Sequence, residues 1–119
     1  MRKKRLPSIK ALRRKLDKVF AAYIRQRDHG KQCISCGSRG PLQAGHWVKR
    51  QHQSVRWDER NCHGQCVRCN LWLHGNEGAY ALALIDKYGR SVVDELLTLK
   101  HKTWKLSRDE LEELISRYS

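Results

Sequence analysis

The apolar positions between Ser8 and Arg27 recur every three or four residues, as they do along one face of an amphipathic helix. We therefore predict a helix over this stretch, packed on the rest of the domain by its apolar face. Its cations fall on other faces, where they suit phosphate contacts that carry no sequence information; a merely solvated basic face is the alternative. The expected buried residues are Leu12, Leu16, Val19, Phe20, Tyr23 and Ile24, and the expected phosphate contacts are Arg13, Arg14 and Lys18.

Glycines interrupt residues 31–75 so often that loops and short strands are expected there rather than long helices. Helical periodicity returns after Gly75 and predicts three further helices. Their starts are marked by Asn76, by a capping box of Ser91 with Asp94, and by a second box of Ser107 with Glu110, while the expected core residues are Leu82, Ile85, Val92, Leu96, Leu111, Leu114 and Ile115. The predicted class is α+β, with a small irregular core flanked by an N-terminal basic helix and C-terminal helices.

The chain has 119 residues and a net charge of +13, which allows one compact domain and points to a polyanionic partner such as nucleic acid. The charge is uneven: residues 1–32 hold 12 basic and 2 acidic residues, 33–75 hold 6 and 2, and 76–119 hold 7 and 8. We expect a basic arm at 1–9 before a single domain at 10–119. Without an apolar run of about 18 residues, we expect no membrane contact and a cytoplasmic protein.

Two C-x-x-C pairs stand out among the five cysteines, because together they can fill a tetrahedral zinc shell. They are Cys33 with Cys36, and Cys66 with Cys69. Disulfides and a redox pair are the competing interpretations, and neither fits an unsecreted basic chain as well. Hydrophobic residues make up only 39% of the chain, so zinc would staple a modest core. Cys62 is interpreted as a spare buried thiol, with an alternative zinc ligand as the other option.

The 29 residues between Cys36 and Cys66 exceed the spacing of a plain zinc ribbon and contain His46 and Asn61. Asn70 and His74 follow the second pair four residues apart, so on a helix they would share a face. An imidazole, an asparagine in a loop and a two-ligand pair on a helix are typical of a one-metal phosphodiesterase.

This order of residues resembles the HNH nuclease motif with its ββα-metal core, over residues 33–75. From about Leu12 to Tyr118 the chain also resembles the NinG/Rap recombination proteins of lambdoid phages. The segments that carry this resemblance are Ala44–His46, Arg56–Glu59, His63, Gln65–Asn70, His74–Asn76 and Tyr80–Leu84. The resemblance implies a structure-specific endonuclease that cleaves branched DNA, such as D-loops and Holliday junctions, in the cytoplasm of a bacterial host.

The resemblance also implies individual roles. His46 would be the general base that takes a proton from the attacking water, and Asn61 would orient the loop that presents this base. Asn70 and His74 would bind a catalytic Mg²⁺ or Mn²⁺, while the four-cysteine zinc would be structural. Gly45 departs from the pattern, since many HNH enzymes have Asp or His there, and Asp58 is our hypothesis for the carboxylate that Mg²⁺ prefers.

We therefore expect a metal-dependent DNA endonuclease that leaves 5′-phosphate ends, with Lys49, Arg50, Arg56 and Arg68 holding the backbone near the scissile phosphate. We further expect a homodimer, since symmetric cutting of a four-way junction requires two active sites, and recombination proteins as partners. The alternatives are a catalytically idle zinc module that binds branched DNA, a simple HNH nicking enzyme without branch selectivity, and a structural partner of a recombinase.

For His63 and for the four tryptophans, the sequence allows both a DNA-binding and a structural role. His63 could bridge a phosphate or stabilise the turn before Cys66. Trp47, Trp57, Trp72 and Trp104 could stack on unpaired bases, but in a chain with one Phe and one Met we favour their burial in the core.

Overall fold

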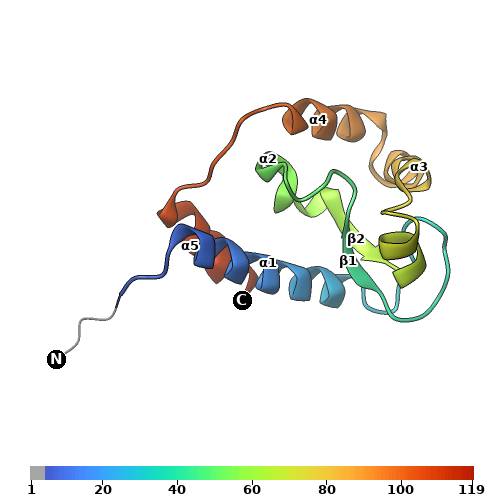
Figure 1. Ribbon diagram of the computed structural model, residues 1–119. Helices are drawn as coiled ribbons and strands as arrows, with labels where there is room; N and C mark the ends of the chain where they lie inside the picture. The colour runs from blue at the N-terminus through green and yellow to red at the C-terminus, as the bar shows by residue number, and fades with distance from the viewer. Residues whose placement is uncertain (1–4) are drawn as a thin grey trace.

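The computed structural model describes residues 5–119 and contains helices with one small sheet, as expected for an α+β protein (Figure 1). Its elements, in chain order, are α1 (Ile9–Arg27), β1 (Gln43–His46), α2 (Gln53–Arg56), the short helix η1 (Glu59–Asn61), β2 (Cys62–Gln65), the π-helical turn η2 (Arg68–Trp72), α3 (Glu77–Tyr88), α4 (Arg90–Lys100) and α5 (Arg108–Tyr118). Residues 1–4 of the expected basic arm lie outside the described residues.

Helix α1 forms where the apolar spacing predicts it. The Ser8 hydroxyl accepts a hydrogen bond from the Ala11 amide at 3.0 Å and so caps the first turn. The residues buried along its inner face, at intervals of four, are Leu12, Leu16, Phe20 and Ile24. At its C-terminal end, the Asp28 carboxylate accepts the Gly64 amide at 2.8 Å, which fixes the helix to strand β2.

Strands β1 and β2 pair antiparallel, with His46 opposite Cys62 and Gly45 opposite His63. Because side chains alternate across a strand, His46 and Cys62 face α1, and the ring of His46 lies 6.3 Å from that of Phe20. Gly45 and His63 face α3, where the Tyr80 hydroxyl donates to the Gly45 carbonyl at 2.7 Å. The sheet therefore separates two hydrophobic clusters.

The first cluster joins α1 and α5 to one face of the sheet and includes the buried Trp57. The second joins α3 and α4 to the segment after β1 and includes the buried Trp47. Figure 1 shows α1 along the lower side, with α5 beside its first turns, and α4 along the top with α3 at the right; the strands and α2 lie between them. No helix within residues 5–119 is long and apolar enough to cross a membrane.

The C-terminal helices are where they were predicted, but two details were wrong. On α3, Leu82 is 71% and Ile85 36% exposed, while Tyr80 and Leu84 are fully buried. The periodicity predicted that a helix forms here, but not which of its faces is buried. The hydrogen bond from the Tyr80 hydroxyl to the Gly45 carbonyl helps to fix that face. Helix α4 begins at Arg90 without side-chain capping, so no box of Ser91 with Asp94 exists.

The box of Ser107 with Glu110 is confirmed at the start of α5, and Leu96, Leu111 and Ile115 are buried as predicted. Val92 and Leu114 are half-buried at the edges of the two clusters. Asn76 stands at the start of α3 as predicted, but makes no capping bond and has a left-handed backbone. Its side-chain amide instead donates to the sulfur of Cys69 at 3.5 Å.

Candidate functional site

Four cysteine sulfurs converge from two segments that are 30 residues apart. Those of Cys33, Cys36, Cys66 and Cys69 all lie within 4.8 Å of one another, and Cys36 Sγ is 3.7 Å from Cys66 Sγ. Tetrahedral zinc with bonds of about 2.3 Å to sulfur requires sulfurs about 3.8 Å apart, so the cluster fits this ion. The four cysteines could therefore hold a metal such as zinc. A closed shell of four sulfurs has no open position for a substrate.

Local hydrogen bonds shape both turns of the cluster. The Cys33 amide donates to the Ser38 carbonyl at 2.9 Å and the Gly37 amide donates to the Cys33 carbonyl at 2.9 Å. Gly37 has a φ of 75°, a value that favours glycine. In the second turn, the Cys69 amide donates to Cys66 Sγ at 3.4 Å, as expected beside a thiolate that ligates a cation.

Cys62 is a fully buried thiol outside this cluster, as interpreted from the sequence, and the other interpretation, an alternative zinc ligand, is wrong. Burial raises its pKa to about 12, so the thiol stays protonated at neutral pH. Its sulfur faces the ring of His46, 3.9 Å from Nδ1.

Asn61 is fully buried and holds the segment that follows His46. Its Oδ1 accepts from the Val48 amide at 2.8 Å, while its Nδ2 donates to the carbonyls of Val48 at 3.0 Å and Val55 at 3.1 Å. The Asn61 carbonyl also accepts from the Trp47 amide at 2.9 Å. This asparagine thus fixes the loop between β1 and α2 at several points.

The imidazole of His46 is oriented by one strong contact, in which Nε2 lies 2.8 Å from the Arg56 carbonyl. A carbonyl only accepts, so Nε2 carries the proton and Nδ1 keeps its lone pair. Burial lowers the pKa of His46; the hydrogen bond to Arg56 and the charge of Asp17 act in the opposite direction, and the cation of Arg50 lowers it further. The ring is therefore neutral at pH 7, with a basic nitrogen at Nδ1.

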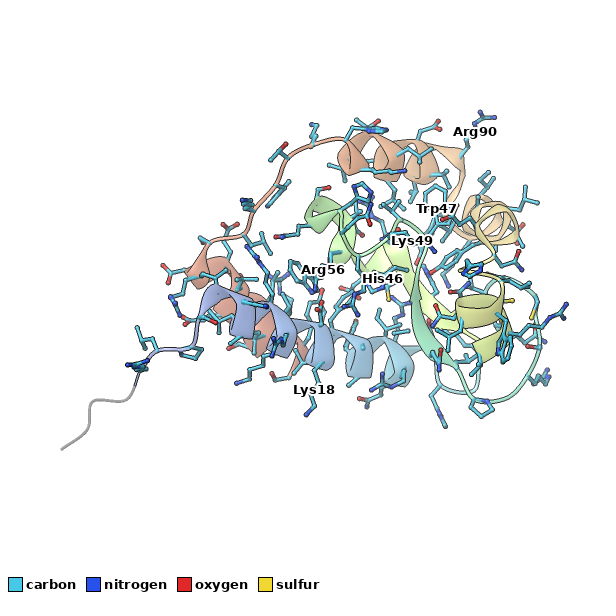
Figure 2. The ribbon with its side chains drawn as sticks, in the orientation of Figure 1. Lys18, His46, Trp47, Lys49, Arg56 and Arg90 are labelled. Carbon is cyan, nitrogen blue, oxygen red and sulfur yellow. The ribbon has the colours of Figure 1, made fainter. Side chains whose placement is uncertain are left out.

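His46 lies in a surface hollow of about 270 Å³ with Asn70, Lys49, Arg50 and Ala44. Asn70 donates from Nδ2 to Gln43 Oε1 at 2.8 Å, which leaves its Oδ1 available as a ligand. The Lys49 ammonium donates to the His74 carbonyl at 2.7 Å and Arg50 is exposed. The structure thus brings together four of the residues expected near the scissile phosphate, and Figure 2 shows His46 and Lys49 in the centre of the molecule.

His74 does not share a helix face with Asn70, contrary to the sequence prediction. The π-helical turn η2 ends at Trp72, where the Leu73 amide donates back to Arg68, five residues earlier. His74 then adopts a left-handed φ of 51°. Its imidazole is exposed and does not line the hollow of His46.

The carboxylate of Asp58 is engaged by a neighbouring cation. Its carboxylate caps η1 by accepting from the Arg60 amide at 2.9 Å and forms an ion pair with the Arg60 guanidinium at 2.8 Å. It lines a different hollow, beside Trp57 and Trp104. The structure therefore does not place Asp58 among the residues that line the hollow of His46.

The expected DNA contacts fall into three groups. Lys49 and Arg50 line the hollow, and Arg68 is exposed at the start of η2. Arg56 instead forms a two-point ion pair with Asp17 of α1, which also accepts from the Trp57 indole at 3.0 Å. Arg14 and Lys18 are exposed on α1 and Arg13 is half-buried; Figure 2 shows Lys18 pointing away from His46.

Sequence reasoning missed Asp17 and Gln65, because each acts through a partner distant in sequence. Asp17 pairs with Arg56, 39 residues away. Gln65 is fully buried and donates from Nε2 to Ser35 Oγ and to the Gly75 carbonyl, both at 2.8 Å, which ties the two cysteine turns together. For Gln65, the sequence signal that was available is a polar residue within a short strand whose other side chains are buried.

The structure shows where His63 and the four tryptophans lie, the residues whose roles the sequence left open. His63 is buried, with Nδ1 3.3 Å from the Tyr80 hydroxyl and Nε2 2.9 Å from the Tyr88 hydroxyl, so it has a structural position and cannot reach a phosphate. Trp47 and Trp57 belong to the core, as predicted. The prediction of burial is wrong for Trp72, which is 76% exposed, and for Trp104, which is 47% exposed.

The chain is similar to known phage proteins over most of its length. A family model described as "Bacteriophage Lambda NinG protein" matches residues 1–119. Protein ninG of Salmonella phage P22 is 38% identical over 100 residues, which are 82% of this chain and 49% of that protein. Protein ninG of Escherichia phage lambda is 42% identical over 78 residues, which are 63% of this chain and 38% of that protein. The chain spans about half the length of the curated relatives it matches.

No solved structure matches the chain. The family model covers every residue of the chain, and the identity to the relatives extends over most of its length. The chain belongs to the NinG family of lambdoid phage proteins.

Proposed function

We propose that this protein is a metal-dependent DNA endonuclease with an HNH core of the ββα-metal type. The observation that carries this proposal is the orientation of His46, whose Nε2 is held by the Arg56 carbonyl so that Nδ1 keeps the lone pair. Nδ1 lies 3.9 Å from the Cys62 sulfur, and His46 lines one hollow with Asn70, Lys49 and Arg50. Two antiparallel strands followed by a short helical turn, stapled by four cysteines, support the same core.

In the proposed reaction, His46 accepts a proton at Nδ1 from a water molecule, which attacks the phosphorus atom in line with the leaving 3′ oxygen. The Arg56 carbonyl stabilises the resulting imidazolium through Nε2, and Asn61 keeps this geometry by fixing the loop after His46. Lys49 and Arg50 bind the phosphate oxygens. The products carry 5′-phosphate ends.

Asn70 is the residue that would hold a divalent ion, through its free Oδ1, with further oxygen ligands from the DNA phosphate. Such an ion would stabilise the negative charge that develops on the phosphate. The hollow presents no carboxylate among its described lining residues. This neutral donor set fits Mn²⁺ or another softer ion better than it fits Mg²⁺.

Branched recombination intermediates, such as D-loops and Holliday junctions, are the proposed substrates. The net charge of +13 supports a nucleic-acid partner, and the resemblance to the NinG/Rap proteins supports branch selectivity. We also propose that two copies of the chain act on one four-way junction, each contributing a single active site, and that recombination proteins are the partners.

One observation favours a second candidate function. The absence of a carboxylate among the described residues that line the hollow of His46 would also suit a catalytically idle module that binds branched DNA. That alternative predicts tight junction binding and no cleavage. A nicking enzyme without branch selectivity would cut linear duplexes as well as junctions.

The test is a cleavage assay on linear, single-stranded, D-loop and four-way DNA of matched sequence, with Mg²⁺, Mn²⁺ or no added metal. The proteins are the native chain, His46→Ala and, as a matched control, His29→Ala, which removes an exposed histidine outside the hollow. The proposal predicts metal-dependent cutting of branched DNA by the native and His29→Ala proteins, and binding without cutting by His46→Ala. Binding without cutting by all three would establish the idle module.

A further inference from the structure

The segment that joins α4 to α5 is a second cationic surface, although the C-terminal third of the chain carries a small net negative charge. Residues 100–105 contain three lysines, His101 and Trp104, and no acidic residue occurs between Glu95 and Asp109. Figure 1 shows this connection running as an extended segment between the two helices. Basic and acidic residues nearly cancel over residues 76–119 as a whole, so the net charge of this third does not reveal the basic segment.

Its side chains are accessible and unpaired. Lys102 and Lys105 are exposed, Lys100 is half-buried, and none of the three lies within ion-pair distance of a carboxylate in residues 5–119. Trp104 is 47% exposed. Together with His52 they line a hollow of about 290 Å³. The exposed indole offers a face for stacking, and the ammonium groups beside it can contact phosphates.

Shared lining residues relate this hollow to the one around His46 through a third hollow. Lys100 and His52 also line a neighbouring hollow of about 360 Å³, and Lys49 lines both that neighbour and the hollow of His46. The only carboxylate among the described residues that line these three hollows is that of Glu77, 3.6 Å from the Lys49 ammonium. A predominantly basic path therefore leads from the proposed scissile phosphate to Trp104.

We infer that this path binds a single strand of nucleic acid that leaves the cleavage site, with its phosphates on Lys100, Lys102 and Lys105 and an unpaired base against Trp104. Cationic grooves with exposed aromatic side chains are the physical basis of single-strand binding, since only an unpaired base offers its face for stacking. The inference rests on the proposed function and refines it: the path would recognise the unpaired strand at a branch point.

The test measures binding in a His46→Ala background without added Mg²⁺ or Mn²⁺, so that cleavage does not interfere. The probes are a fluorescein-labelled oligothymidylate of about 16 nucleotides, the upper site size of single-strand binding folds, and a duplex of equal length. The test variants are a triple change of Lys100, Lys102 and Lys105 to Gln, and Trp104→Ala with Trp104→Phe. A triple change of Lys87, Arg90 and Arg117 to Gln is the charge-matched control, because these exposed cations lie outside the path. Zinc content and thermal unfolding confirm that each variant is folded.

The triple lysine variant should lower the slope of log Kd against log salt for oligothymidylate by about 2, because each phosphate contact on a single strand accounts for about 0.7. Trp104→Ala should weaken oligothymidylate binding about tenfold and Trp104→Phe should restore most of it, with duplex binding nearly unchanged. The inference is overturned if the triple lysine variant behaves like the control triple, or if Trp104→Ala binds oligothymidylate as the parent does. Because binding is measured apart from cleavage, an inactive native enzyme with these binding changes would refute the nuclease and not the path.

Discussion

The side chain of Gln65 occupies the space beside Gly45, so that a Cβ atom at residue 45 would lie 1.9 Å from Gln65 Oε1. Gln65 is held there by hydrogen bonds to Ser35 and to the Gly75 carbonyl. This arrangement leaves no room at residue 45 for the side chain that many HNH enzymes have directly before the general base. An Asp or His at residue 45 would displace the glutamine that joins the two cysteine turns.

Gly45→Ala should therefore destabilise the zinc-saturated protein by about 1–3 kcal/mol, the usual cost of overpacking a tight interior site. The same change should cost much less in a Gln65→Ala background, because the clashing side chain is then absent. The free energy of unfolding in denaturant, measured for the native chain, both single variants and the double variant, gives the coupling directly. Equal costs of Gly45→Ala in the two backgrounds would show that Gln65 is not the obstacle.

Asp17 fastens α1 to the segment that carries the Arg56 carbonyl, through its ion pair with Arg56 and its bond to the Trp57 indole. Asp17→Asn should lower the free energy of unfolding by about 2 kcal/mol, since a half-buried guanidinium loses its counter-ion. Asp94→Asn is the matched control: its partner Arg90 lies 4.0 Å away on an exposed helix face, and such pairs contribute little. Chemical denaturation of both variants checks this prediction, and similar losses in the two would contradict it.

The parts of the fold that depend on neighbouring residues were predictable from the sequence. Helix α1 and the capping box of Ser107 follow from spacing within a few residues, and the four cysteines follow from the fixed geometry of a C-x-x-C turn. The position of His46 beside Asn70 was implied by the family resemblance and is consistent with the hollow that they share.

The sequence did not predict which face of a helix is buried or at which residue a helix ends. His74 was expected on the helix of Asn70, but η2 ends in bonds that span five residues, which periodicity does not reveal. Asp58 lies on the same insert as His46, yet its carboxylate forms an ion pair with Arg60. Burial of Trp57 and exposure of Trp104 depend on how distant helices pack.

Removal of the metal should unfold the cysteine turns, since four thiolates held close together repel one another without a cation and the binding energy of a structural metal is folding energy. The purified protein should contain one zinc per chain, and a chelator should abolish cooperative thermal unfolding. Cys66→Ala should lose the zinc, whereas Cys62→Ala should retain it, because Cys62 lies outside the cluster. Metal analysis of both variants distinguishes these roles; a loss of zinc in Cys62→Ala would contradict the assignment.

His63 should make stability depend on pH. Burial lowers its pKa from 6.5 to about 4, so the unfolded chain binds a proton at a higher pH than the folded one. Its contribution is thus fully present above about pH 6.5 and is lost progressively as the pH falls towards about 4, by about 3 kcal/mol in total. In His63→Gln this component should be absent, so the difference in unfolding free energy between the two proteins should shrink on acidification. Parallel stability curves for the two proteins would refute the assignment, and their comparison cancels the acid sensitivity of the cysteine ligands.

The proposed nuclease depends above all on His46 acting as the base, and the most direct test is the single-turnover rate of junction cleavage against pH. Burial lowers the pKa of His46, so the rate should stay constant through neutral pH and fall only below the usual pKa of histidine. His46→Ala should bind the junction normally and lose at least about a hundredfold in rate, the lower range for a general base. A His46→Ala protein that cleaves at the native rate, or a native protein that binds junctions and never cleaves them with any divalent metal, would contradict the account.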